Sequence, residues 1–472
     1  MTETSTKIKL SKKIAYGIGQ IGDTIPYTLF YTFYLIYLTD MVGIKPIIAG
    51  SISAIAIVWN AVLDPIIGYL SDNCKNKKGR RRTFMGKIII PYVVITALLF
   101  FPVEINETLQ AIYYIAVGVA LWTCYTVWVI PYLSLVSDMT TDHDERNNIR
   151  MFNILCGAIY LAISASGPMA VQAFVLGMGY SAKTGWAVSG IAFALLTGIG
   201  LFISWFGLRG TEPDANTLVE PETKDNIFVI LKKSFKIRAF RQICLMTIIG
   251  IIGITIVEAV EMYLFMNRLD MSEGQISLLY LMYAVAGIVI VPIITAIMNK
   301  IGKRELFVIV SIISAIGALL FYIFGINTPV MAMVYIVLIF SLFAGVFWTV
   351  YITFAYDIAE IYEYKYEQRC DGSIVAIVDL SYKLGAAVAS FLSGALLTAI
   401  GYVEGGANQS QEVLDGINMI CTLPAVITFV VAGFIVFLYP VTRKKYDLLV
   451  AGIKARKEGQ PYDESEFETL LK

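Results

Sequence analysis

The stretch that decides the fold is IVAIVDLSYKLGAAVASFLSGALLTAI, residues 374–400. Its length and apolar character are typical of a helix that crosses a bilayer, which needs about 20 residues. Near its centre stands Lys383, and Asp379 precedes it by four residues. A charged side chain inside a membrane is costly unless it faces a polar interior and finds a partner, so such residues mark pathways or binding sites. The stretch therefore predicts a transporter.

The composition of the whole chain agrees with this interpretation. The chain has 472 residues, of which 57% are hydrophobic, and its mean hydropathy is +0.72. Typical soluble domains are about 45–50% apolar, so we expect an all-α integral membrane protein and not an enzyme. The formal net charge is zero and there is no Walker glycine loop. The zero total charge says nothing about partners, whereas the lack of a Walker loop argues against ATP hydrolysis. We also expect no nucleic-acid partner and no cofactor.

Apolar segments recur at roughly twelve places, each close to the length of a spanning helix. They are 14–39, 46–71, 83–102, 109–136, 150–175, 184–208, 243–265, 277–298, 306–325, 329–355, 372–400 and 416–440. No strand alternation of the barrel type is visible, so helices are the expected form. The expected parts are an N-terminal six-helix bundle at 1–208, a cytoplasmic central loop at 209–242, a C-terminal six-helix bundle at 243–440 and a cytoplasmic tail at 441–472.

Lys and Arg are distributed unevenly between the connections. Those after odd-numbered segments hold only Lys45, Lys183 and Arg268 of the 36 basic residues. The positive-inside rule then predicts a multi-pass protein of the cell membrane with both termini cytoplasmic. Short basic loops follow the second and eighth segments, as parallel repeats would produce. The tail is expected to form an amphipathic helix on the inner leaflet or to be disordered.

Four separated motifs resemble one known family. They are YGIGQIGD at 16–23 with YLTD at 37–40, WNAVLDPIIG at 59–68, YTVWVIPY at 125–132, and DIAEIYEYK at 357–365 followed by Arg369 and Gly372. Together they resemble the glycoside-pentoside-hexuronide:cation symporter family of the major facilitator superfamily. The resemblance implies a major facilitator fold, with twelve transmembrane helices in two six-helix bundles. It also implies symport of a sugar or glycoside with a cation, H⁺ or Na⁺.

Asp64 lies four residues after Asn60 in the second segment, so both side chains project from one helical face. A carboxylate beside an amide oxygen suits Na⁺, or a proton if the carboxyl is desolvated. We expect cation coupling here, with at most a transient Na⁺ and no structural metal. The alternative is that Asp64 pairs with a basic group of another helix. Relatives carry acids where this chain has Asn60 and Val129, which leaves proton coupling or uncoupled transport open.

Asp23 precedes Pro26 in the first segment and shares a helical face with Tyr27. A carboxylate flanked by tyrosines suits sugar hydroxyls, because aromatic faces can cover the apolar side of a pyranose. We expect Asp23 to bind substrate and to contribute to cation coupling; the alternative is a structural partner for Lys383. The resemblance implies an acidic sugar ligand one position later, at Thr24.

The resemblance also assigns residues in both halves to the sugar cavity. It implies that Tyr125 and Trp348 line the cavity and that Arg150 lies at its edge. Packing or an interfacial belt is the alternative for the aromatic residues, and a snorkelling cation is the alternative for Arg150. We expect Lys383 to pair with carboxylates of other helices and to release them when the cation binds. Asp379 is its alternative local partner and a candidate third carboxylate.

Charged residues of opposite sign near the loops predict an inner gate. They are Asp72, Arg80 and Arg81 in the first half and Asp357, Glu360, Glu363 and Arg369 in the second. Pairs between the two sets would close one side of the cavity and part on the other, as alternating access requires. Ordinary solvated loop charge is the alternative. Glu258 and Glu261 in the seventh segment are unusual for a membrane and receive no assigned role.

The expected function is import of a sugar or glycoside by cation symport, with alternating access around a midplane cavity. We expect a monomer whose only other partner is membrane lipid. One alternative is a major facilitator carrier of a non-sugar, amphipathic or drug-like solute. Another is a non-transporting sugar sensor, which would ordinarily carry a soluble output domain.

Overall fold

A computed structural model gives the structure of most of the chain. The residues that it leaves undescribed are 1–7, 73, 75, 77, 78, 141, 213–226, 369, 407, 459, 463, 464, 466 and 472. The described residues form helices and no β-strand. The α-helices are α1 Leu10–Ile18, α2 Ile21–Thr28, α3 Tyr34–Ile36, α4 Pro46–Asp72, α5 Arg80–Leu98, α6 Glu107–Met139, α7 His143–Gly177, α8 Ala182–Gly207, α9 Ile227–Ser234, α10 Arg238–Tyr263, α11 Glu273–Ile301, α12 Lys303–Phe324, α13 Pro329–Met333, α14 Ser341–Tyr366, α15 Asp371–Ala399, α16 Gln411–Phe437, α17 Arg443–Lys457 and α18 Glu468–Leu471. Wider π-helical turns occur at Leu29–Phe33, Tyr37–Val42, Leu264–Arg268 and Val334–Phe340.

Among the described residues, ten helices are long and apolar enough to cross a membrane. Two further predicted segments also fall on helix, although not as long apolar helices. Segment 14–39 falls on the run of short helices that ends at Val42, and segment 83–102 falls largely on α5, which begins with three arginines. The chain is therefore a multi-pass membrane protein, and the predicted segments mark its helices.

The first helical run is interrupted between α1 and α2. Here side chains of other helices donate hydrogen bonds to backbone carbonyls. Pro26 has no N–H, so the carbonyl of Gly22 lacks its usual helical donor. Tyr92 of α5 supplies one, with its hydroxyl 2.7 Å from Gly22 O. One turn earlier, Trp128 Nε1 of α6 donates to Gly19 O at 3.1 Å. The irregular backbone between α1 and α2 is thus held by tertiary contacts, which places Asp23 at a helix start.

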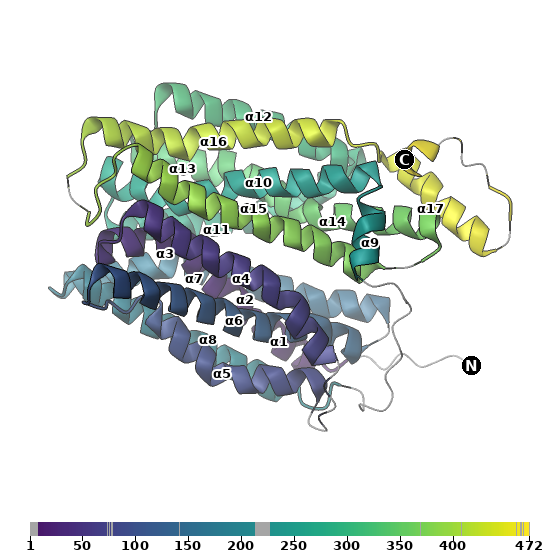
Figure 1. The fold of residues 1–472 in the computed structure, drawn as a ribbon, viewed down its shortest axis with the longest axis horizontal. Coiled ribbons are helices and arrows are strands. Elements are labelled where there is room, and N and C mark those ends of the chain that lie inside the picture. Colours follow the sequence, from purple (N-terminus) through teal and green to yellow (C-terminus); the bar gives the residue numbers. More distant parts are fainter. Residues whose placement is uncertain are drawn as a thin grey trace. The chain divides into compact units, whose positions relative to one another are not determined.

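The first compact unit comprises Met1–Val219, Glu258–Val285 and Ser390–Ile417. Within it α4 packs on α6, α5 packs on α6 and α8, and α1 packs on α7. Figure 1 shows α4 beside α6, and α5 beside α8. These contacts bring the candidate residues of α2, α4 and α6 into one body.

The second compact unit comprises Glu220–Val257, Ala286–Ala389 and Asn418–Lys472. Within it α12 and α17 both pack on α14. The tail helix α17 is anchored by Arg456 Nη1, which donates to Tyr364 O at 2.6 Å. The expected helix in the tail is therefore present, and it packs on protein. The division into bundles at 1–208 and 243–440 stays a prediction.

Candidate functional site

Asp23 is the centre of a polar network in the first unit. The hydroxyl of Tyr125 donates to Asp23 Oδ1 at 2.5 Å, and Gln20 Nε2 donates to Asp23 Oδ2 at 2.5 Å. Asn153 of α7 in turn donates to Gln20 Oε1 at 2.6 Å and to the hydroxyl of Tyr132 at 2.7 Å. The network fixes the Asp23 carboxyl between α2 and α6. The sequence predicted Asp23 and Tyr125, but not Gln20 or Asn153.

A chain of aromatic rings lies next to this network. The rings of Tyr27 and Tyr31 lie 4.4 Å apart. Tyr31 meets Trp122 of α6 at 5.8 Å, and Trp122 meets Tyr125 at 4.8 Å. Because Tyr125 also holds Asp23, a hydrogen-bonding carboxyl and aromatic faces occur together, which is the combination that sugar binding uses. Tyr31 and Trp122 were not predicted.

Thr24 and Arg150 lie close to the same network in different ways. Thr24 Oγ1 is 3.4 Å from Gln20 Nε2, at the long end of hydrogen bonding. Arg150 is exposed on α7, one turn before Asn153. Thr24 thus touches the Asp23 network, whereas Arg150 stands beside it on the helix that supplies Asn153.

A second polar group links α4 to α6. Thr126 Oγ1 lies 2.7 Å from Asn60 Oδ1 and 3.1 Å from Asp64 Oδ1. Asn60 is buried and Asp64 is partly buried. The one hydroxyl proton of Thr126 cannot serve both oxygens fully. The three oxygens can therefore be satisfied together by a proton on Asp64 or by a hard cation.

Thr126 was not predicted, although it lies within the motif at residues 125–132. Val129, one turn further along α6, is buried and contributes no ligand atom. The group thus has one carboxylate, one amide and one hydroxyl oxygen. Among the described residues, no group of three or more His, Cys, Asp or Glu could hold a metal ion.

In the second unit, Lys383 and Asp379 of α15 form an ion pair. Lys383 Nζ lies 3.4 Å from Asp379 Oδ2. The lysine is 7% exposed, whereas a third of the Asp379 side chain is exposed. Asp379, the alternative local partner expected from the sequence, is therefore in contact with Lys383. Pairing of Lys383 with Asp23 or Asp64, which belong to the first unit, stays a prediction.

Three aromatic residues of the second unit form a cluster that includes the sequence neighbour of Lys383. The ring of Trp348 in α14 lies 5.5 Å from that of Tyr382, the neighbour of Lys383 in sequence. Tyr351 lies 5.7 Å from Trp348 and 6.1 Å from Tyr382. Trp348 is 36% exposed, so the cluster has an open face. The sequence predicted Trp348, and its i+3 neighbour Tyr351 could have been found from the helical spacing.

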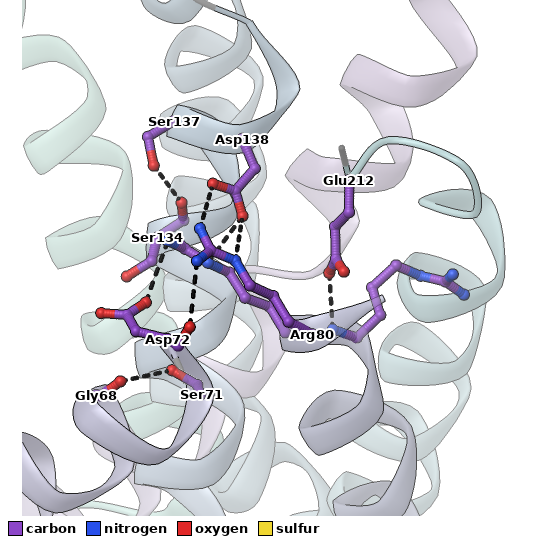
Figure 2. A network of polar contacts seen from close by, with 10 residues as sticks. Gly68, Ser71, Asp72, Arg80, Ser134, Ser137, Asp138 and Glu212 are labelled. Carbon is purple, nitrogen blue, oxygen red and sulfur yellow. Dashed lines mark hydrogen bonds and ion pairs between the residues drawn. The ribbon is translucent and has the colours of Figure 1, made fainter. Parts of the chain in front are cut away.

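The predicted gate residues of the first half form a charge network (Figure 2). Arg80 Nη2 lies 2.8 Å from Asp138 Oδ1, and Arg81 Nε lies 2.9 Å from Asp138 Oδ2. Arg81 Nη2 also lies 3.3 Å from Asp72 Oδ1. The side chain of Asp138 is 8% exposed, whereas that of Asp72 is 57% exposed. Asp138 of α6, which the sequence missed, is thus the buried partner of both arginines.

Glu212 extends this network beyond the end of α8 (Figure 2). Its Oε1 accepts from the backbone N–H of Arg82 at 2.8 Å. Burial raises the pKa of Glu212, and the Arg82 contact opposes this shift. A Cβ at Gly79 would collide with Glu212 Oε2, and Gly79 has a φ of +103°, so the start of α5 requires glycine there.

The predicted gate residues of the second half lie at the end of α14. Asp357 is 1% exposed, and its Oδ1 lies 2.5 Å from Lys303 Nζ of α12. Glu360 and Glu363 are partly exposed on the same helix, and Arg369 lies outside the described residues. The ion pairs recorded for these charges lie within their own unit, so pairing between the two sets stays a prediction.

Comparison with known proteins identifies relatives along almost the whole chain. The family described as MFS/sugar transport protein matches residues 15–443. An uncharacterized symporter, YjmB of Bacillus subtilis, is 27% identical over 95% of this chain and 96% of its own. A glucuronide carrier protein homolog of Escherichia coli is 24% identical over 95% of this chain and 96% of its own.

Solved structures agree on the fold. The crystal structure of a D-xylose-proton symporter matches with a TM-score of 0.65 at 14% identity, covering 92% of this chain and 98% of that one. The major facilitator fold and the family resemblance predicted from the sequence are therefore confirmed.

Proposed function

Since the chain belongs to the MFS/sugar transport protein family, we propose that it imports a sugar or glycoside across the cell membrane in symport with H⁺ or Na⁺. Support for the cargo comes from the aromatic rings beside Asp23, and from the relative whose name is a glucuronide carrier homolog. The termini are proposed to be cytoplasmic, because the basic residues concentrate on their side of the membrane.

The observation that carries the coupling proposal is the contact of Thr126 with Asn60 and Asp64. Three oxygens from two helices meet at 2.7 and 3.1 Å in a segment that crosses the membrane. Ionisable groups inside a membrane are functional by default. The arrangement gives a single anionic ligand, which suits a proton or a weakly bound Na⁺. Asp64 carries the cation, and Asn60 and Thr126 orient it.

Sugar binding is assigned to two polar and aromatic groups. Asp23 accepts hydrogen bonds from sugar hydroxyls, while Tyr27 and Tyr125 bound the ring. In the second unit Trp348 offers an aromatic face, and Lys383 donates to an oxygen of the sugar or of another helix. Until then, the ion pair with Asp379 at 3.4 Å balances the positive charge of Lys383. Exchange between these partners is the step that links sugar to cation.

Alternating access requires contacts that form in one state and break in the other. We propose that charged residues near the loops exchange their present partners for one another. They are Asp72, Arg80 and Arg81 on one side and Asp357 on the other. At the opposite helix ends, the hydroxyl of Tyr402 lies 2.9 Å from each carboxylate oxygen of Asp40. This contact is proposed to break when the cavity opens at this end.

The test is gradient-driven uptake by the variant Asp64→Asn in proteoliposomes. We expect concentrative uptake to be abolished while sugar exchange persists, since the amide can neither be protonated nor neutralise a cation. Glu104→Gln is the matched control, because that side chain is 82% exposed, and it should accumulate sugar normally. Unchanged concentrative uptake by Asp64→Asn would assign Asp64 a structural role.

A further inference from the structure

Two glutamates of α10, Glu258 and Glu261, lie inside a membrane-spanning helix outside the groups described so far. They are one helical turn apart, so their side chains share a face. Glu261 is 3% exposed, and Glu258 is partly exposed. Both belong to the first unit, in the segment Glu258–Val285 that also contains the start of α11. Their surroundings decide which protonation state they can adopt.

Glu261 has too few partners for a buried carboxylate. Its Oε1 accepts a hydrogen bond from the hydroxyl of Tyr280 at 2.8 Å. Its Oε2 is buried without a hydrogen-bond partner, and so is Oε2 of Glu258. No ion pair to either glutamate is recorded among the residues that the structure describes. A carboxylate normally needs several donors or a cation when water is removed.

Among the residues that the structure describes, the ionisable groups near Glu261 carry no positive charge. The ionisable side chains acting on it are Glu258 and Tyr280, and Tyr283 of α11 lies within the electrostatic reach of both glutamates. The ring of Tyr280 is itself flanked by Phe33 at 5.7 Å and Phe265 at 6.0 Å. An unpaired charge in such surroundings costs far more than the uptake of a proton.

We propose that Glu261 and Glu258 form a proton-binding site, in which Glu261 holds the proton and the more exposed Glu258 exchanges it with the surroundings. The ligand is a proton and no metal, because the carboxyl groups of Glu258 and Glu261 with the hydroxyl of Tyr280 supply too few oxygens for a coordination shell. The site lies on α10 and α11, whereas the coupling group around Asp64 lies on α4 and α6. It is a second titratable site of the transporter.

The proposal is tested by infrared difference spectroscopy on the purified full-length protein without sugar. A carboxyl C=O band of a neutral acid is expected at neutral pH and should fade on alkalinisation. In the Asp64→Asn background, which removes any neutral carboxyl at Asp64, Glu261→Gln should lose this band. Glu412→Gln, which changes an exposed acid, and Asp64→Asn should keep it. Because no sugar or gradient is present, the result is independent of whether the chain performs symport.

Two further variants separate a proton-exchanging site from a static one. Tyr280→Phe removes the donor to Glu261 Oε1, so the band should shift to higher frequency. Glu258→Gln should keep the band but slow its shift after transfer to deuterated water. A band that survives Glu261→Gln in the Asp64→Asn background, that is absent from the unmodified protein, or that does not respond to alkaline pH would overturn the proposal. Loss of the band on adding Na⁺ at constant pH would also overturn it, in favour of a metal cation.

Discussion

The substitution Thr126→Val tests the coupling group at the residue that joins its two helices. Valine keeps the shape of threonine and removes only the hydroxyl, which lies 2.7 Å from Asn60 Oδ1 and 3.1 Å from Asp64 Oδ1. A hydrogen bond to a charged group contributes about 1.5–3 kcal/mol. The contact with Asp64 is the longer of the two, so the lower value applies, and it corresponds to roughly a tenfold change in affinity.

The direction of this change depends on the coupling ion. If the ion is Na⁺, the variant loses a ligand oxygen and its half-saturating Na⁺ concentration should rise roughly tenfold. If the ion is H⁺, the Asp64 carboxylate loses a donor and holds its proton more tightly. Half-maximal uptake should then move to higher pH by about one unit. The assay is initial uptake of sugar by proteoliposomes as a function of Na⁺ concentration and pH.

Thr123→Val is the matched control for this experiment. Thr123 lies one turn earlier on α6, donates to Val119 O at 2.8 Å and accepts from Trp59 Nε1 at 2.9 Å. It has the same chemistry but no contact with the coupling group, so its ion dependence should equal that of the unmodified protein. An unchanged ion dependence in Thr126→Val would refute the role given to the hydroxyl.

Three other predictions concern the charge networks and the second unit. Asp138→Asn leaves the buried Arg81 and the partly buried Arg80 without this carboxylate and should lower the free energy of unfolding by about 3–5 kcal/mol in thermal or denaturant unfolding of the purified protein. Asp72→Asn, at a 57% exposed side chain, should cost at most about 1 kcal/mol, and equal costs would contradict the network. Trp348→Leu should raise the half-saturating sugar concentration roughly 2- to 10-fold in uptake kinetics, and no change would remove Trp348 from the site. The hydrogen bond from Lys13 lowers the pKa of Glu145, so this pair stabilises the folded protein above the unfolded pKa and ceases to do so as pH falls through the folded pKa. The free energy of unfolding of Glu145→Gln should therefore decline less steeply below about pH 4. An unchanged decline at low pH would count against this pair.

The sequence predicted the helices well because hydrophobic length is a local property. Segments such as 46–71 and 184–208 match α4 and α8 within a residue or two at each end. Apart from Pro26, nothing in the sequence predicted the breaks in the first helical run. They depend on donors such as Tyr92, which reach helix carbonyls only after α5 has packed.

The candidate site was predictable only along single helices. Helical spacing placed Asn60 beside Asp64, and Asp379 beside Lys383. Thr126 and Asp138 were not predicted, because their partners lie on other helices. Thr126 of α6 contacts α4 and Asp138 of α6 contacts α5, and the packing of these helices decides which side chains meet. Neither residue type is unusual for its segment, so no local pattern marked them.

The central claim is tested most directly by sugar uptake into proteoliposomes that contain the purified protein, with Na⁺ and H⁺ gradients imposed separately and a panel of glycosides supplied. The account predicts that at least one gradient drives accumulation of a glycoside above its equilibrium level, and that dissipating the gradient releases it. Equilibration of glycosides without accumulation under either gradient, or no uptake of any of them, would contradict the account.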